Sequence, residues 1–245
     1  PEDERLAALY GAEVEYLDFE VGRLMAGLAA RGMLEETLVV LTADHGETFW
    51  EQGNFWNHGL WVGEADVHVP LIIRGPGVLP GARVSTPVSG VDLAPTILDA
   101  VGLSAGPGDD PGRGRSLLGA LGGADLATRA VFSEATQPGP RLESGGELAW
   151  PGDAKPQAVR LGGWKLIKAP YLGVRQLYNL AVDPSGRRDL LSEPSLEPPA
   201  RAALQDLERA HRAWRDAAAP RPSTFDPAQA EALRGLGYGG DDSDD

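Results

Sequence analysis

LVVLTADHGE, residues Leu38–Glu47, is the segment from which the architecture of this 245-residue chain can be inferred. Its first half is apolar and rich in β-branched residues, which predicts a buried parallel strand. Asp44 and His45 follow that strand, and Gly46 then allows the backbone to turn. Ligands of open α/β sheets bind at the carboxyl ends of strands, and a carboxylate beside an imidazole suits a divalent metal. The alternative is that Asp44 caps the next turn and that His45 is an ordinary loop histidine.

The loop after this segment contains a second candidate for chemistry, His58, which lies between an asparagine and a glycine. Residue type alone favours a solvated loop histidine. The same loop is rich in aromatic rings, which either line a substrate cleft or close over the core: Phe49, Trp50, Phe55, Trp56 and Trp61. His68 directly precedes the next apolar run, and we interpret it as structural.

Six sequence blocks, taken in order and with their spacing, resemble the C-terminal half of the sulfatase family in the alkaline phosphatase superfamily. The resemblance extends from about Tyr10 to Tyr238. The blocks are TADHGE (42–47), NHG (57–59), HVPLIIRGPG (68–77), SGVDLAPTILDAVGL (89–103), GGWKLI (162–167) and QLYNLAVDP (176–184). The implied fold class is α/β: an alkaline-phosphatase-like core, incomplete because only its C-terminal half is present, with a small antiparallel α+β C-terminal subdomain.

The resemblance also implies an activity, the metal-dependent hydrolysis of sulfate esters by a formylglycine nucleophile. Asp44 and His45 match the family's metal-binding pair, and His58 matches a position that contacts the anionic ester. The implied metal is a divalent cation, with Ca²⁺ expected and Mn²⁺ or Mg²⁺ as alternatives, because many members carry Asn in place of His45. The implied substrate is a small anionic ester or a sulfated glycan, and the implied location is periplasmic or extracellular.

The chain also departs from the family pattern. It has no cysteine and no Ser-x-Pro-x-Arg motif, from which the nucleophile would be made, and it lacks the paired N-terminal aspartates of the metal site. We therefore expect a fragment of a longer enzyme that carries half of the site and is inactive alone. Two alternatives stay open: a phosphate or phosphonate ester hydrolase of the same superfamily, or a non-catalytic binding module.

Composition narrows the possible partners. Lys and Arg number 22 against 36 Asp and Glu, so the formal net charge is −14. This charge argues against nucleic acid or an anionic membrane surface as a partner, because both require a basic face. No apolar run approaches the roughly 20 residues of a membrane span, and no signal peptide is recognisable. The sequence gives no prediction of oligomeric state.

Periodicity predicts the remaining elements of residues 1–125, the catalytic-core part of the chain. Apolar residues in steps of three and four from Tyr10 to Leu28 predict an amphipathic helix, one half of a βαβ crossover. Strands are predicted over Val67–Ile73 and Ala82–Val88, followed by a helix over Asp92–Val101 in which Asp92 is the N-cap or, as an alternative, a ligand. A short helical turn is predicted over Ser116–Leu121.

Residues 126–218 are predicted to form the smaller subdomain, and residues 219–245 a tail with an acidic, disordered end. The subdomain is expected to contain a strand, a hairpin turning at Gly162-Gly163, a further strand and an amphipathic helix: 130–135, 158–161, 164–169, 176–180 and 200–214. Lys165 and Lys168 alternate with apolar neighbours, which indicates a solvated strand face. His211 is interpreted as an exposed or packed helix residue, and 137–156 as a long loop.

Overall fold

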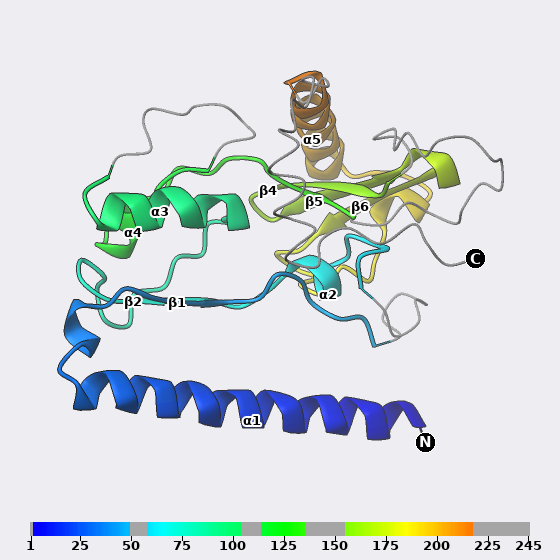
Figure 1. The fold of residues 1–245 in the computed structure, drawn as a ribbon. Coiled ribbons are helices and arrows are strands. Elements are labelled where there is room, and N and C mark those ends of the chain that lie inside the picture. The colour runs from blue at the N-terminus through cyan, green and yellow to red at the C-terminus, as the bar shows by residue number, and fades with distance from the viewer. Residues whose placement is uncertain (1, 50–57, 104–113, 136–154, 218–245) are drawn as a thin grey trace, which may run out of the picture.

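The computed structural model describes residues 2–49, 58–103, 114–135 and 155–217. It is a mixed α/β structure with two antiparallel sheets (Figure 1). The first sheet pairs β1 (Val39–Thr42) with β2 (Leu71–Arg74); the second has the order β3 (Val131–Glu134), β4 (Gln157–Leu161), β5 (Trp164–Ala169) and β6 (Val174–Asn179). The helices are α1 (Glu2–Ala30), α2 (Glu64–Val67), α3 (Leu93–Ala100), α4 (Leu118–Leu121) and α5 (Pro198–Ala217).

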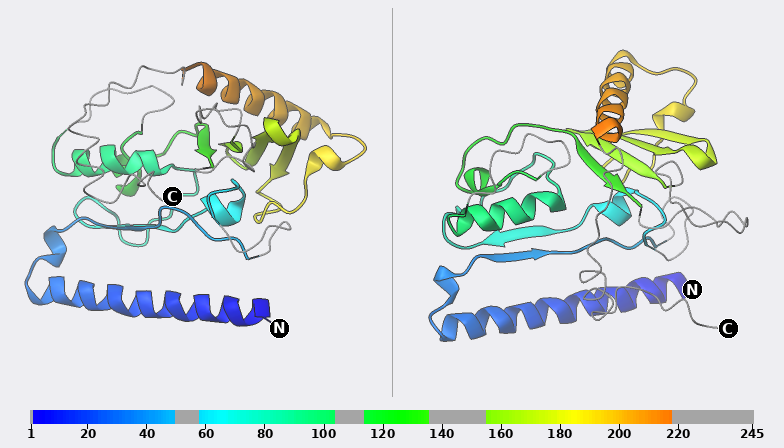
Figure 2. Two further views of the ribbon diagram at one scale, coloured as in Figure 1. Left: turned by 45° about the vertical axis from the view of Figure 1, so that its right-hand side comes forward. Right: turned by 45° about the horizontal axis from the view of Figure 1, so that its top comes forward.

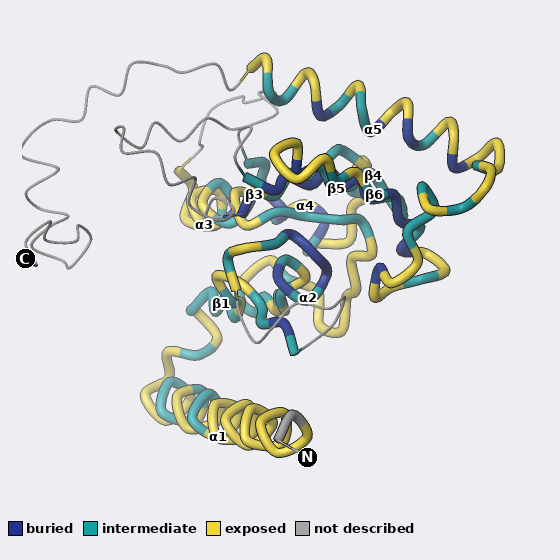
Figure 3. The backbone as a smooth tube through the Cα atoms, turned by 90° about the vertical axis from the view of Figure 1, so that its right-hand side faces the viewer, coloured by how far each residue is buried: buried dark blue, intermediate teal, exposed yellow. Residues whose placement is uncertain are grey.

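The first sheet lies between α1 on one side and α3 with α4 on the other, and Figure 2 shows the same layering from two further directions. The predicted helix is confirmed as α1, but its apolar stripe is exposed: Tyr10, Val14, Leu17 and Leu24 are among its exposed side chains. Figure 3 shows that exposure along most of the helix. Near its N-terminal end, the Tyr10 ring meets Phe49 edge to face, with centroids 4.7 Å apart.

The prediction of a buried parallel strand over the LVVL segment is wrong in two respects. β1 pairs with β2 in antiparallel register, Val39 opposite Arg74 and Thr42 opposite Leu71. Its first three residues are only half-buried and its last is exposed. A continuous apolar run is typical of a strand covered on both faces, and the described residues cover β1 only partly.

Two further strand predictions need correction. The strand expected over Val67–Ile73 begins at Leu71, because Val67 ends α2 and Pro70, which has no backbone N–H, lies between the two elements. The segment Ala82–Val88 is not a strand. It contains Pro87 and uses the Thr86 hydroxyl to donate to the Leu126 carbonyl at 3.3 Å, a contact outside any sheet ladder.

The second sheet follows the chain order, and its predicted elements are confirmed. The hairpin between β4 and β5 turns at Gly162, whose φ of +57° is the left-handed conformation that glycine adopts without strain. On one face, Leu204 and Leu207 of α5 pack against fully buried side chains of β4, β5 and β6: Val159, Leu166 and Leu177. On the other face, Val62 packs against Ala158, Ile167, Tyr178 and Leu180.

The prediction that Lys165 lies on a solvated strand face is also wrong. This side chain is only 3% exposed, and its Nζ lies 2.6 Å from Oε1 of Glu64 in α2. The error arises because α2, distant in sequence, covers this face of β5. Lys168, on the same strand, is half-buried.

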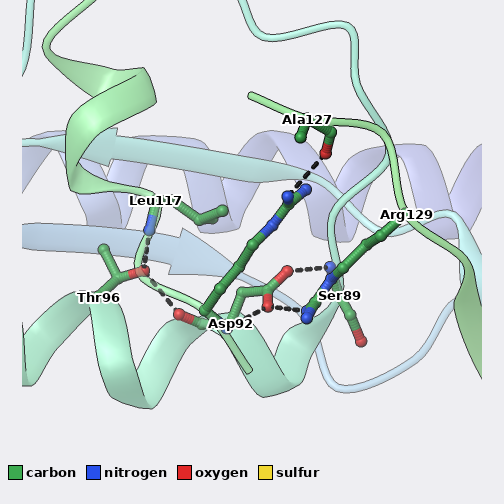
Figure 4. Close-up of polar contacts among 7 residues, drawn as sticks. Ser89, Asp92, Thr96, Leu117, Ala127 and Arg129 are labelled. Carbon is green, nitrogen blue, oxygen red and sulfur yellow. Dashed lines mark hydrogen bonds and ion pairs between the residues drawn. The ribbon is translucent and has the colours of Figure 1, made fainter. Parts of the chain in front are cut away.

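Asp92 is fully buried at the start of α3, where it joins three segments (Figure 4). Its carboxylate accepts hydrogen bonds from the backbone N–H groups of Ser89 and Arg115, at 2.9 and 2.8 Å, and forms an ion pair with Arg129. Thr96 adds a second link, since its hydroxyl donates to the Asp92 carbonyl and accepts from the Leu117 N–H. Asp92 therefore holds the predicted N-cap position of α3, but its side chain does not cap the helix; the carboxylate is bonded to the segments around it.

Other predictions fall outside the described residues. They concern Trp50, Phe55 and Trp56, nearly all of the 137–156 loop, and the tail over 219–245. The boundary between residues 125 and 126 stays a prediction. Among the described helices, none combines the length and apolar character that crossing a bilayer requires.

Candidate active site

A cleft of about 540 Å³ opens at the carboxyl end of β1, where the sequence places its first candidates. Asp44 and His45 line it together with residues of the opposite wall, which include Ser85, Ser133 and Arg160. The cleft thus lies between the end of the first sheet and the face of the second sheet that α2 partly covers. The position agrees with the expectation that ligands meet strand ends, although this sheet is antiparallel.

Asp44 projects into solvent, with 88% of its side chain exposed. The backbone N–H of His45 donates to its Oδ1 at 3.0 Å. This hydrogen bond is the main cause that holds the pKa of the Asp44 carboxyl below its usual value, and nearby imidazoles act in the same direction. The carboxylate is therefore ionised near neutral pH and accessible to a cation.

The His45 ring has one nitrogen held by the backbone and the other near Asp44. Its Nδ1 lies 2.8 Å from the Gly46 carbonyl oxygen, which can only accept, so Nδ1 carries the proton. Its Nε2 is then the nitrogen with the lone pair, and it lies 3.7 Å from Oδ2 of Asp44. A carboxylate oxygen and an imidazole nitrogen at this separation form a donor set that fits one divalent cation, and the backbone contact supplies the orientation that metal-binding histidines require.

His58 lies directly against His45. The two rings stack with centroids 4.1 Å apart and planes inclined by 20°. Nδ1 of His58 lies 3.1 Å from Oε2 of Glu47. A carboxylate at Nδ1 orients an imidazole, as in hydrolases that use histidine as an acid or base.

Gly46 connects these residues to α2. Its backbone N–H donates to the Asp66 carbonyl at 2.8 Å. A Cβ at this position would lie 1.9 Å from the Ala65 carbonyl oxygen, far inside van der Waals contact with a rigid backbone atom. Close packing against α2, and not a turn conformation alone, therefore requires glycine after His45.

The structure brings together all three predicted site residues, Asp44, His45 and His58. It adds Glu47, which sequence reasoning missed although this carboxylate lies within the TADHGE block. His68 is 69% exposed, with its Nδ1 3.7 Å from Oε2 of Glu64. Among the described residues, no group of three or more His, Cys, Asp or Glu side chains is placed to hold a metal ion.

Comparison with known protein families gives one match along the first part of the chain: the family model described as Sulfatase matches residues 1–103. Among curated relatives, the choline-sulfatase of Rhizobium meliloti (strain 1021) is 32% identical over 204 residues, which are 82% of this chain and 36% of that protein. Arylsulfatase K of Danio rerio is 34% identical over 190 residues, 77% of this chain and 34% of that protein. The chain spans about a third of the length of these relatives.

Solved structures also match this chain over most of its length. The structure of BT4656, which was determined in complex with its substrate D-glucosamine-2-N,6-O-disulfate, matches with a TM-score of 0.60 and 25% identity, over 83% of this chain and 40% of that one. A phosphonate monoester hydrolase from Silicibacter pomeroyi matches with a TM-score of 0.60 and 32% identity, over 80% of this chain and 37% of that one. The expected fold class, part of an alkaline-phosphatase-like α/β fold, is confirmed.

Proposed function

We propose, from the premise that this chain belongs to the sulfatase family of the alkaline phosphatase superfamily, that it forms part of the active site of a metal-dependent sulfate ester hydrolase. The observation that carries this proposal is that Asp44 and His45 line one cleft and His58 stacks on His45, on a chain whose curated relatives are sulfatases. With no cysteine and no Ser-x-Pro-x-Arg motif in the chain, the nucleophile would come from residues outside it.

Asp44 and His45 would hold the divalent cation, for which Ca²⁺ is the expected identity. When bound, the cation supplies Lewis-acid stabilisation of the negative ester oxygens and a fixed position for the reacting groups. The chain's own contribution is to keep Asp44 ionised, through the His45 backbone N–H, and to hold the His45 ring through the Gly46 carbonyl. Both contacts are made by the turn itself, so the donor pair is preorganised.

His58 would act on the ester. With Nδ1 bonded to Glu47, its Nε2 is the nitrogen that exchanges a proton with the substrate. A protonated His58 can stabilise charge on the ester and then give its proton to the departing oxygen. Glu47 supports both tasks because its contact with Nδ1 holds the orientation of the ring.

The substrate would be a small sulfate ester or a sulfated glycan, and the enzyme would work in the periplasm or outside the cell. A second candidate, hydrolysis of phosphonate or phosphate esters, is favoured by the 32% identity to the phosphonate monoester hydrolase. Both reactions use an anionic ester and a cation that neutralises it. The chemistry of the nucleophile, which this chain does not contain, would distinguish them.

The test uses the enzyme that contains this chain, with aryl sulfates and aryl phosphonates as substrates and metal content measured in parallel. Asp44→Ala should abolish activity and bound metal together. His58→Ala should lower turnover on the order of 10²–10⁴-fold while metal content stays near wild type. Glu35→Ala, an exposed carboxylate before β1, is the control and should change neither. Loss of metal in His58→Ala, or full activity in either site variant, would refute the assignment.

A further inference from the structure

A buried cluster of charges lies deep in the cleft, between α2 and the second sheet. Glu64 of α2 accepts from Lys165 Nζ at 2.6 Å and lies 3.4 Å from Nη1 of Arg160. The Glu64 and Lys165 side chains are 8% and 3% exposed. Asp66, also buried, brings a second negative charge close enough to act on Lys165. Two carboxylates thus balance two cations, so the cluster has no net charge with which to attract an anion. Its contacts join α2 to the second sheet.

Such a cluster contributes more to geometry than to stability. Burial lowers the pKa of Lys165, which shows that desolvation of the ammonium opposes its attraction to Glu64. Buried ion pairs generally add little net free energy of folding compared with apolar side chains of similar size, whereas removal of one partner is costly. What the pair does provide is a short, directional contact that fixes where α2 lies on β5.

α2 in turn is linked to the chain segments of both histidines. On one side, Gly46, next to His45, donates to the Asp66 carbonyl and packs against Ala65 without room for a side chain. On the other side, the chain from His58 runs through the buried Val62 directly into α2. Figure 1 shows α2 between the end of β1 and the second sheet.

We propose that the buried Glu64–Lys165 ion pair positions the stacked rings of His45 and His58 by fixing α2 against β5. Lys165 and Glu64 are then positioning residues, since neither touches the rings. The inference rests on the proposed function only in taking these rings as active-site groups. Whether the ion pair sets the position of the rings can be tested without measuring catalysis.

The test is nuclear magnetic resonance of the 245-residue chain with isotope-labelled histidine. Cross-peaks between ring protons report the His45–His58 stack, and the His211 ring, on the opposite face of the second sheet, is the internal reference. Lys165→Met should remove the His45–His58 cross-peaks and shift both ring signals, and leave His211 unchanged. Lys168→Met, on the opposite face of the same strand, is the control and should keep the His45–His58 cross-peaks and both of these ring signals as in the wild type.

Glu64→Gln is the second variant, in case Lys165→Met does not fold. It keeps the shape of the side chain and removes its charge, and it should shift both rings in the same direction by a smaller amount. Thermal unfolding is measured alongside. Intact ring cross-peaks in a folded variant with a lowered melting temperature would show that the pair stabilises without positioning, and would overturn the proposal. An equal response in Lys168→Met would also overturn it. An enzyme inactive towards sulfate esters, with the ring response intact, would refute only the proposed function.

Discussion

The two antiparallel sheets differ in how completely the chain covers them. In the second sheet, Val159, Leu166 and Leu177 are fully buried under α5, and the segment around Val62 covers the other face. In the first sheet no β1 or β2 residue is buried, and Ile72 is 62% exposed. The candidate active-site residues follow β1, in the less covered sheet. The well-packed sheet thus supplies most of the buried core, whereas the less covered sheet precedes the candidate site residues.

Asp92, a fully buried and hydrogen-bonded carboxylate on the first sheet's side of the molecule, gives the largest expected effect on the free energy of unfolding. Asp92→Ala removes a fully buried carboxylate from Arg129 and from two backbone N–H groups, and should lower the free energy of unfolding by about 3–5 kcal/mol. Denaturant unfolding measures the loss. The matched control is Asp99→Ala, whose carboxylate accepts from Ser116 at an exposed position and should cost about 1 kcal/mol or less. Equal losses of unfolding free energy in Asp92→Ala and Asp99→Ala would show that burial of the Asp92 carboxylate makes no difference.

The core of the second sheet comes next. Leu207→Ala should lower the free energy of unfolding by about 2–5 kcal/mol, because the fully buried Leu207 would leave a cavity against the sheet. Leu98→Ala, in α3 and 37% exposed, makes the same chemical change and should cost clearly less. A larger loss of unfolding free energy in Leu98→Ala than in Leu207→Ala, measured by denaturant unfolding, would contradict the conclusion that the second sheet is the better packed.

Alkaline pH should weaken the second sheet selectively. Burial, aided by Asp189 and Asp183, raises the pKa of Tyr178 to about 12. The folded state therefore keeps this proton longer than the unfolded chain, whose tyrosine titrates near 10, so stability is complete below pH 10 and falls as pH rises towards 12. Over this range the wild type should lose about 2 kcal/mol more than Tyr178→Phe in denaturant unfolding. Tyr171→Phe, at a more exposed tyrosine, is the control and should change the pH dependence less. Parallel pH curves for wild type and Tyr178→Phe would refute this account.

The smallest effect is expected on the first sheet itself. Ile72→Ala should change the free energy of unfolding by about 0.5 kcal/mol or less, as is usual for exposed positions. Unfolding should be followed at several protein concentrations. A cost similar to that of Leu207→Ala, growing with concentration, would show that another molecule covers β2.

The sequence was most informative where local signals agree with the contacts. The Gly162-Gly163 turn predicted the β4–β5 hairpin, and apolar periodicity predicted α5, because both are encoded within a few residues. The sequence also indicated the candidate site, since Asp44 and His45 follow a recognisable strand. It failed where distant segments meet. Lys165 looks solvated until α2 covers it, and no local pattern pairs Glu47 with His58.

The chain order of the second sheet has a consequence during synthesis on the ribosome. β1 and β2 are complete at Arg74, whereas α5, which covers the second sheet, ends at Ala217, about 140 residues later. At roughly 5–20 residues per second, the less covered sheet emerges about 7–30 s before the sheet that holds α2 in place. For that interval β1, which precedes Asp44, exists without the second sheet that forms the other side of the cleft. The candidate active site is therefore complete only after α5 has been made.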